Sequence, residues 1–489
     1  MEQGLSGSWM WELRNKACNT ERMPTRRSPD VPTLLAQLST GEPIMAGELA
    51  GRLGINRMAL SRLVAQAGSQ VIRLGRTRAT AYAARQNTAA GSQWPLYRLR
   101  ADATLEDLGQ LHALSGGAFH FEANRPRPNL QRSPDSDVDA CFPGLPWFLD
   151  DQRPQGFLGR NFAHRHASAL GVPADLNRWQ LGDVLLALVH SGGTEAGDLL
   201  LGGAAVQHAL AGIDEPPDRV AADDRLRHYP QRALAAVEGE DIGSSPGGEQ
   251  PKFTATVEHP EGRCAVLVKF AQPAAGEAAE RWSDLLACEH LALDTLRDAG
   301  VEAARSSLLQ SDTHTFLEVE RFDRTPDLLG RRGLVSLLAL SAAFTGEATA
   351  DWATAGEQLQ AQSWLSAATV QAMARLHAFG RLIGNTDMHQ GNIGFHLQDA
   401  GALPLAPAYD MLPMSLAPSR TGVLRAAAPL APVAPTGNGD LLHLAWAAPL
   451  AVRFWERVAA SSAIRSDVLK GLAAENAKRV AVMGYRYGG

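Results

Sequence analysis

The sequence predicts an α+β protein in which a small helical module precedes a larger body. Three observations support this fold class. Short amphipathic stretches followed by a basic hairpin occupy residues 31–95, two alternating strands precede a long amphipathic helix in residues 252–299, and the pattern beyond residue 334 is mainly helical. The body is therefore expected to have a strand-rich part followed by a helical part.

The composition is that of an ordinary globular protein and argues against several other classes. The chain has 489 residues, of which 45% are hydrophobic and 20% charged. Its four cysteines are scattered without a CxxC pair, which argues against a disulfide framework or a zinc site. No apolar stretch is long enough to cross a membrane, and the N-terminus lacks an apolar signal core. We therefore expect a cytoplasmic protein without a membrane partner.

The first hundred residues are basic although the whole chain carries a net charge of -6. They hold 14 Lys and Arg against 6 Asp and Glu. Residues 1–30 have no periodicity and are expected to form a disordered leader. Residues 31–95 then give two short helices, a turn at Gly54-Ile55-Asn56, a third helix over 58–67 and a hairpin with strands at 71–74 and 80–82. This order predicts a winged helix-turn-helix domain.

Such a domain points to duplex DNA as a partner. A recognition helix presents its first residues to base edges, and arginines of the wing meet phosphates or the minor groove. The alternative is that the module makes contacts with proteins. The candidate DNA-binding residues are Arg57, Ser61 and Arg62 on the third helix and Arg73, Arg76 and Arg78 in the hairpin.

Four short motifs in the body follow one another in an order that suggests phosphate chemistry. Gly247-Gly248 precedes the first strand, and glycines let backbone N–H groups approach phosphate oxygens. Lys269 lies in the otherwise apolar second strand and needs an anionic partner, for which Glu289 on the following helix is a candidate. The alternative is that Glu289 faces solvent.

The third and fourth motifs supply carboxylates. Asp387 and Asn392 are five positions apart, as in the catalytic loop of protein kinases, where the Asp accepts the hydroxyl proton and the Asn holds magnesium. Asp410 follows 18 residues later, and a carboxylate there can bind the metal that bridges the phosphates. The four motifs together predict an ATP- and Mg²⁺-dependent phosphotransferase.

These motifs resemble those of HipA-type kinases, the toxin components of bacterial toxin–antitoxin pairs. The resemblance runs through residues 245–252, 318–324, 385–392 and 407–411, more weakly through 142–159 and 193–203, and covers about residues 140–480. The leading helix-turn-helix departs from the usual arrangement and looks like a subgroup that carries its own DNA-binding domain. The implied architecture is a protein-kinase-like two-lobed HipA fold preceded by a winged helix-turn-helix domain. Its body would comprise an N-terminal-like subdomain and linker over 96–240, an N-lobe-like region over 241–325 and a helical C-lobe over 326–489.

The resemblance also implies a role for each matched residue. Asp387 would be the catalytic base, Asn392 and Asp410 would hold Mg²⁺, and Ser245 would be the autophosphorylated serine, with neighbouring Ser244 as the alternative. The expected ATP-binding residues are Gly247, Gly248, Glu249, Gln250, Pro251, Lys252, Lys269, Glu320, Arg321, Phe322, His389 and Tyr409. Among these, Glu320 to Phe322 would line the adenine through the backbone.

Three functions remain open at this point. The first is a serine/threonine protein kinase whose substrate could be a translation factor such as an aminoacyl-tRNA synthetase, with an antitoxin as a further partner. The second is a DNA-binding transcription regulator whose kinase fold only senses nucleotide. The third is a small-molecule phosphotransferase. Retention of Asp387, Asn392, Lys269 and Asp410 favours an enzyme, and residues 318–324 favour the HipA-type protein kinase.

Overall fold

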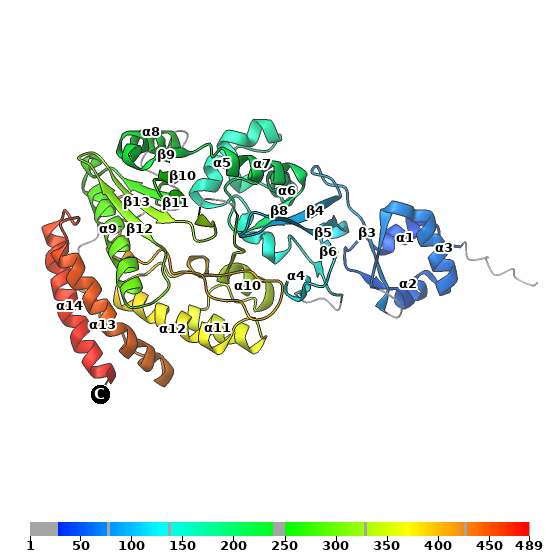
Figure 1. Cartoon of the computed structure of the whole chain (residues 1–489). Helices are drawn as coiled ribbons and strands as arrows, with labels where there is room; N and C mark the ends of the chain where they lie inside the picture. Colours follow the sequence, from blue (N-terminus) through cyan, green and yellow to red (C-terminus); the bar gives the residue numbers. More distant parts are fainter. Residues whose placement is uncertain are drawn as a thin grey trace, which may run out of the picture. The chain divides into compact units, whose positions relative to one another are not determined.

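The computed structural model describes residues 28–75, 79–134, 138–237, 250–326, 330–419, 421–424 and 428–488. The chain divides into two compact units, Met1–Ala84 and Arg85–Gly489 (Figure 1). The leader expected over residues 1–30 lies outside the described residues except for its last three positions.

The first unit contains helices and a small sheet where the sequence patterns predicted them. The helices are α1 (Val31–Gln37), α2 (Ala46–Leu53) and α3 (Arg57–Ala67), and the antiparallel strands β1 (Ile44–Met45), β2 (Val71–Leu74) and β3 (Ala81–Ala84) pair in the order β1-β3-β2. Asn56 caps α3, because its side chain accepts a hydrogen bond of 2.9 Å from Ala59 N. The unit ends at Ala84 rather than at residue 95, since the next strand belongs to a sheet of the second unit.

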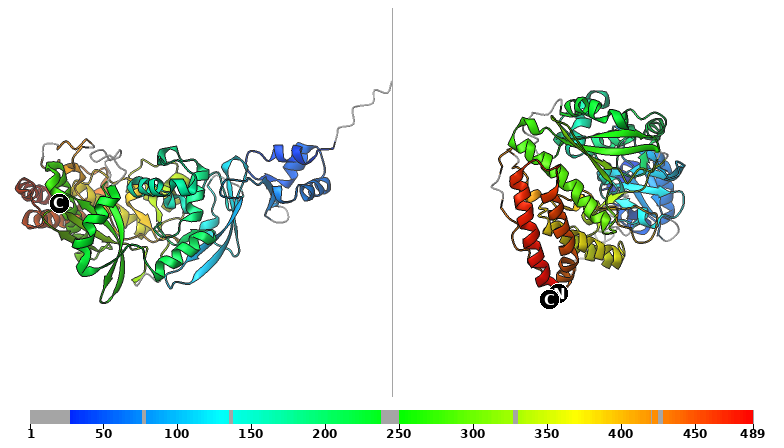
Figure 2. Two further views of the ribbon diagram at one scale, coloured as in Figure 1. Left: turned by 90° about the horizontal axis from the view of Figure 1, so that it is seen from above. Right: turned by 60° about the vertical axis from the view of Figure 1, so that its left-hand side comes forward.

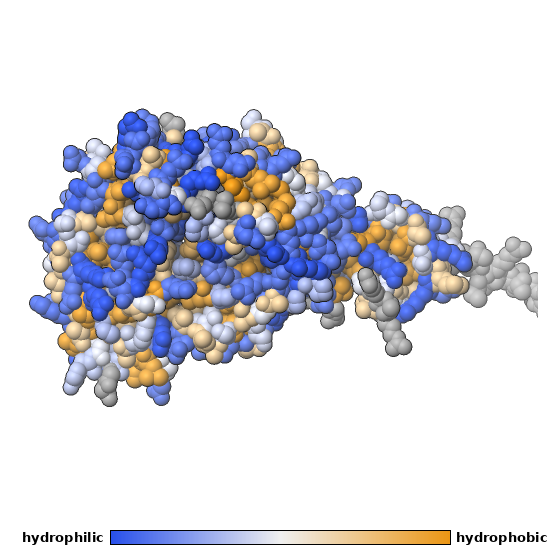
Figure 3. Space-filling view, in the orientation of Figure 1, coloured by the Kyte–Doolittle hydropathy of each residue, from blue (hydrophilic) through white to orange (hydrophobic). Residues whose placement is uncertain are grey.

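The second unit begins with a five-stranded antiparallel sheet in the order β7-β6-β5-β4-β8. Its strands are β4 (Gln93–Leu99), β5 (Leu105–Ala113), β6 (Phe119–Ala123), β7 (Cys141–Phe142) and β8 (Leu199–Leu201), and α5 (Gly156–Leu170), α6 (Leu181–His190) and α7 (Gly203–Asp214) accompany them. On the face shown in Figure 3, hydrophobic residues gather over the region of α5 and α7, whereas most of the remaining surface is hydrophilic.

Residues 124–156 belong to the region 96–240 that is expected to hold a subdomain and a linker, and part of this stretch is packed into the core. Phe142, Trp147 and Phe148 of this stretch are buried in the main core, and Arg127 is fully buried in ion pairs with Glu106 and Asp399. The proline and charged residues of this stretch obscured aromatic anchors that pack against one another and against distant parts of the chain. The segment is therefore an integral part of the second unit.

A second five-stranded sheet, in the order β12-β13-β11-β10-β9, contains the predicted hairpin. Its strands are β9 (Arg219–Ala221), β10 (Lys252–His259), β11 (Gly262–Ala271), β12 (Ser306–Gln310) and β13 (Thr315–Glu320); α8 (Arg225–Val237) and the long helix α9 (Glu277–Asp298) pack against it. The register places Lys252 directly opposite Lys269. Both ammonium groups therefore lie at the same end of the hairpin.

The last part of the chain is helical, as the sequence predicted. It comprises α10 (Leu337–Phe344), α11 (Trp352–Ala361), α12 (Ala367–Leu382), α13 (Asn438–Ala460) and α14 (Asp467–Gly488). The short strand β14 (Val335–Ser336) precedes α10 and pairs with β15 (Gly394–Phe395), which follows α12. Figure 2 shows α13 and α14 side by side next to α9. Among the described helices, none combines the length and the apolar character that a membrane span requires.

Candidate active site

A buried ion pair joins the second strand of the hairpin to the long helix. Nζ of Lys269 on β11 lies 2.7 Å from both carboxylate oxygens of Glu289 on α9, and it also pairs with Asp410. The side chains of Lys269 and Glu289 are 7% and 1% exposed. Burial alone would lower the pKa of Lys269, but the carboxylates of Asp410 and Glu289 outweigh it and raise that pKa. The predicted ion pair between Lys269 and Glu289 is confirmed.

The loop that holds the predicted base follows α12 directly. Asn385 is buried, and its Oδ1 accepts a hydrogen bond of 3.0 Å from Asp387 N while its Nδ2 donates to Asp410 O at 3.2 Å. At the far end of the loop, Asn392 Nδ2 donates to Asp387 O at 2.8 Å. The side chain of Asp387 is exposed. This loop therefore holds a carboxylate that an incoming molecule can reach, and it is joined to the Asp410 segment through Asn385.

Asp410 adopts a backbone conformation that is rare for a residue with a side chain. Its φ is +54°, whereas the neighbouring Tyr409 donates a hydrogen bond of 2.9 Å to Gly391 O. Burial alone would raise the pKa of Asp410, but Lys269 and Lys252 outweigh it and lower that pKa. Strained conformations of this kind concentrate at functional sites, so the backbone here supports a functional role for the carboxylate.

His389 makes hydrogen bonds that stabilise the same loop. Its Nδ1 accepts a hydrogen bond of 3.0 Å from Gly391 N, and its carbonyl accepts one of 3.1 Å from Nε1 of Trp352 at the start of α11. A Cβ at Gly391 would lie 3.0 Å from the His389 ring. The ring therefore packs closely on the turn that carries Asn392.

A cavity of about 370 Å³ opens beside the Lys269 ion pair. One wall carries Lys269, Tyr409 and Asp410, and another carries residues 320–323. These residues belong to the hinge segment, which we define as residues 320–324. Other walls come from the first part of the second unit, including the apolar Leu158, Phe162 and Leu188, and from the hairpin, including Thr254 and Leu267. Of the predicted ATP-binding residues, Lys269, Glu320, Arg321, Phe322 and Tyr409 line this cavity, whereas Gln250, Pro251, Lys252 and His389 do not.

The backbone of the hinge segment is partly engaged already. Glu320 N donates to Arg305 O at 2.8 Å, and Arg321 N donates to Ala265 O at 2.9 Å, because β13 continues its pairing with the adjacent strands there. These two amides are therefore already used as donors and are not free to bind a nucleotide base. The ring of Phe322 lies 5.7 Å from the ring of Tyr409 and forms an apolar part of the cavity wall.

The residues present fit a bound nucleotide with Mg²⁺. Mg²⁺ in phosphate-transfer sites takes one or two protein oxygens, with phosphates and waters completing its octahedron. Asp410, which lines the cavity, and Asn392, which does not, carry oxygens of this kind, and Lys269 on the cavity wall carries a positive charge. Within the described ranges there is no cluster of three or more His, Cys, Asp or Glu suited to a metal.

Sequence reasoning missed Asp151, which also lines the cavity. Its carboxylate accepts hydrogen bonds of 2.6 Å from both the amide and the hydroxyl of Ser336, and burial raises its pKa. Ser336 pairs in register with Gly394, two residues beyond Asn392. The hydrogen-bond partner of Asp151 is 185 positions away in the chain, so no local pattern could identify this residue.

The predicted DNA-binding residues of the first unit are exposed where the structure describes them. Arg57, Ser61 and Arg62 lie on α3, and Arg73 lies on β2, where its Nη2 donates to Thr80 Oγ1 at 3.4 Å. Several predicted residues lie outside the described part of the chain: Arg76, Arg78, Ser244, Ser245, Gly247, Gly248 and Glu249.

Comparisons with known proteins agree with the two parts of the second unit. Residues 90–210 match the family model "YjjJ-like toxin, middle domain", and residues 244–478 match "HipA-like C-terminal domain". The chain is 37% identical over 449 residues to "Toxin YjjJ" of Escherichia coli (strain K12), which covers 91% of this chain and 97% of that protein.

Two solved structures are more distant. The HipA, HipB and operator DNA complex of Shewanella oneidensis MR-1 matches with a TM-score of 0.47 and 15% identity, covering 81% of this chain and 97% of that chain. The Helicobacter pylori proinflammatory kinase CtkA matches with a TM-score of 0.35 and 12% identity, covering 49% and 91%. Because the 37% identical relative is matched over almost its whole length, this chain belongs to the YjjJ-like toxin family and carries a HipA-like C-terminal domain.

Proposed function

We propose that this protein is an ATP- and Mg²⁺-dependent serine/threonine protein kinase of HipA type that restrains growth and binds DNA through its own winged helix-turn-helix domain. One observation carries the proposal. Lys269, held in a buried ion pair by Glu289, lines a cavity together with Asp410, and Asn385 links Asp410 to the loop that presents Asp387. This arrangement supplies a phosphate-binding cation, metal-binding oxygens and an accessible base.

The residues would divide the work as follows. Glu289 holds the Lys269 ammonium in place, so that the ammonium can bind phosphate oxygens without reorganising. Asp410 and Asn392 would hold Mg²⁺, which neutralises charge on the phosphates when it is bound. The exposed Asp387 carboxylate would orient the substrate hydroxyl and accept its proton. Phe322 and Tyr409 would provide apolar surface for the adenine ring of the nucleotide. Gly247 to Lys252 would cover its phosphates.

A protein substrate is favoured over a small molecule by the family membership and by the exposure of Asp387, which leaves room for a large acceptor. A translation factor is the substrate class that the HipA resemblance suggests. An antitoxin partner and a cytoplasmic location belong to the same proposal. The alternative is a DNA-binding regulator that only senses nucleotide, for which the exposed Asp387 would have no task.

The DNA-binding part of the proposal rests on the first unit. Its α2–α3 pair is followed by the β2–β3 hairpin, and α3 exposes Arg57, Ser61 and Arg62 together. A helix of this kind can enter the major groove with its first turn.

The direct test of the kinase proposal is incubation with γ-labelled ATP and Mg²⁺, with and without cell extract, followed by identification of labelled proteins by mass spectrometry. The proposal expects label on a serine or threonine of this chain and of at least one extract protein. Nucleotide binding without any transfer would favour the nucleotide sensor, and label on a small molecule alone would favour the small-molecule enzyme.

A further inference from the structure

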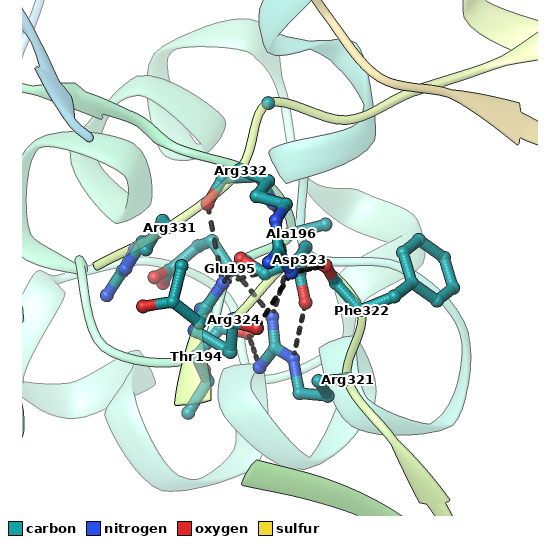
Figure 4. A network of polar contacts seen from close by, with 12 residues as sticks. Thr194, Glu195, Ala196, Arg321, Phe322, Asp323, Arg324, Arg331 and Arg332 are labelled. Carbon is teal, nitrogen blue, oxygen red and sulfur yellow. Dashed lines mark hydrogen bonds and ion pairs between the residues drawn. The ribbon is translucent and has the colours of Figure 1, made fainter. Parts of the chain in front are cut away.

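A buried cluster of charges joins the hinge segment to the middle loop, which we define as residues 192–197. Figure 4 shows the side chains of Arg321 and Arg324 meeting at Asp323. Arg321 pairs with both Asp323 oxygens at 3.0 and 2.8 Å, and Arg324 Nη1 lies 2.8 Å from Oδ2. The Asp323 side chain is 6% exposed. We call these three residues the arginine latch.

The two arginines of the latch also donate hydrogen bonds to the backbone of the middle loop. Arg321 donates to Thr194 O at 2.8 Å and to Glu195 O at 2.9 Å, and Arg324 donates to Glu195 O at 2.7 Å. In return, Gly197 N donates to the Asp323 carboxylate at 2.9 Å. Because these bonds reach backbone atoms, they fix the path of the middle loop whatever its side chains are.

Glycines at both ends of the middle loop let it pack closely against other neighbouring segments. Gly197 has φ +80°, and a Cβ there would lie 3.2 Å from Leu334 N. A Cβ at Gly192 would lie 2.0 Å from Ala205 O. A side chain at either position would therefore disturb the path of the middle loop.

Both partners of this contact line the candidate nucleotide cavity. Thr194, Glu195 and Ala196 form one part of its wall, and Arg321, Phe322 and Asp323 form another. The middle loop falls within the match to the YjjJ-like middle domain, whereas the hinge segment falls within the HipA-like match. The latch thus joins two separately recognised parts of the chain at the cavity itself.

The negative charges of Asp323 and Glu195 allow the arginines to lie together. Arg321, Arg324 and the neighbouring buried Arg331 crowd one another, and burial together with the charges of Arg321 and Arg331 lowers the pKa of Arg324. Burial alone would raise the pKa of Asp323, but Arg321 and Arg324 outweigh it and lower that pKa strongly. Without the Asp323 charge, uncompensated guanidinium groups would repel one another inside the protein.

We propose that Asp323 and Arg324 are positioning residues for nucleotide binding, which hold the middle loop against the hinge segment and so set the width of the cavity. This inference rests on the proposed function. The latch residues touch neither Lys269 nor the Asp387 loop, so their loss should weaken nucleotide binding while the chemistry of a bound nucleotide is retained.

The test uses the full chain with Asp323→Asn, with Arg324→Gln and with Arg324→Lys. Nucleotide affinity is measured with ATP and Mg²⁺ by calorimetry, and the KM for ATP and the kcat for phosphotransfer are measured separately. We expect Asp323→Asn and Arg324→Gln to raise both Kd and KM about tenfold, equivalent to ~1.4 kcal/mol, with kcat nearly unchanged. Arg324→Lys keeps the charge and should recover part of the affinity.

The matched control is Asp440→Asn. It removes a comparable pair, in which Arg381 Nη1 lies 2.8 and 2.9 Å from the Asp440 oxygens, at a place that does not line the cavity. It should lower Tm as the latch variants do but leave Kd unchanged. If the parent binds nucleotide and Asp323→Asn and Arg324→Gln bind it equally well, or if Asp440→Asn weakens binding to the same extent, the latch has no positioning role. If the parent binds no nucleotide, the proposed function fails together with this inference.

Discussion

Lys269 and Glu289 form an ion pair inside the protein, with Nζ of the lysine 2.7 Å from both oxygens of the glutamate. Removing one member of a buried pair leaves the other charge without compensation, at a cost of about 3–5 kcal/mol. We expect Lys269→Met to lower the free energy of unfolding by about that amount and to abolish nucleotide binding. Urea unfolding and calorimetry with ATP measure the two effects.

The double variant Lys269→Met/Glu289→Gln provides the control for this prediction. It removes the isolated glutamate charge, so it should regain part of the lost stability without regaining nucleotide affinity. Equal stability of the single and double variants would show that the buried Glu289 charge does not need Lys269 to compensate it.

DNA binding by the full chain should depend strongly on salt. Each phosphate contact that is lost flattens the slope of log K against log salt by about 0.9. We expect Arg73→Ala to show this change on all sequences alike, whereas Arg57→Ala and Arg62→Ala should relax sequence preference. Fluorescence anisotropy over a salt series measures both quantities.

Arg52→Ala is the matched control for the DNA prediction, because Arg52 lies on α2 and pairs with Glu48 at 2.6 Å. It should leave the slope unchanged. Binding that ignores salt, or no binding, would favour the alternative that the first unit contacts proteins.

Autophosphorylation at Ser245, or at neighbouring Ser244, should switch the protein off. A phosphoserine carries about -1.5 to -2 charges at neutral pH, so it would repel ATP phosphates from the glycine-rich segment. Intact mass after incubation with ATP and Mg²⁺ should increase by one phosphate, and the modified form should bind ATP more weakly. The Ser244→Ala/Ser245→Ala variant should stay unmodified; a phosphate that maps elsewhere would contradict the prediction.

Acid should weaken the fold partly through Glu106. Burial opposes ionisation of this residue, but hydrogen bonds and charges from Arg127 and Arg100 lower the pKa of Glu106 to about 2. Because the unfolded value is about 4.3, the stability that Glu106 contributes is complete above that pH and is lost as the pH falls from about 4.3 towards 2.

Glu106→Gln should therefore lower stability at pH 7 and flatten the loss of stability in this acid window. Urea unfolding of parent and variant at pH 7 and in steps down through the window measures the difference. If the stability of the two proteins depends on pH in the same way, the pKa of Glu106 is not lowered in the folded state.

The sequence could predict those parts of the protein that rest on local patterns. The hairpin 252–271 alternates clearly, and Glu289 lies only 20 positions after Lys269 on an amphipathic helix, so their meeting could be foreseen. In the first unit, Gly54 ends α2 and Asn56 caps α3, so the sequence itself marks where these two helices end and begin.

The parts that the sequence concealed depend on distant contacts. Strand β8 pairs with β4 about a hundred positions earlier, and β5 bends at Gly109, whose φ of +135° interrupts the alternation. The arginine latch and the bond from Asp151 to Ser336 join residues far apart in the chain. No pattern within a short window could reveal these contacts.

The central claim is that Asp387 is the base of a phosphotransferase, and one comparison tests it most directly. Parent and Asp387→Asn are incubated with γ-labelled ATP and Mg²⁺, and transfer to protein is followed over time beside the Kd for ATP. The substitution is nearly isosteric, and the base contributes about 10²- to 10⁴-fold to such reactions. We predict a loss of transfer in that range with a Kd close to the parent value, whereas transfer at the parental rate would contradict the assignment.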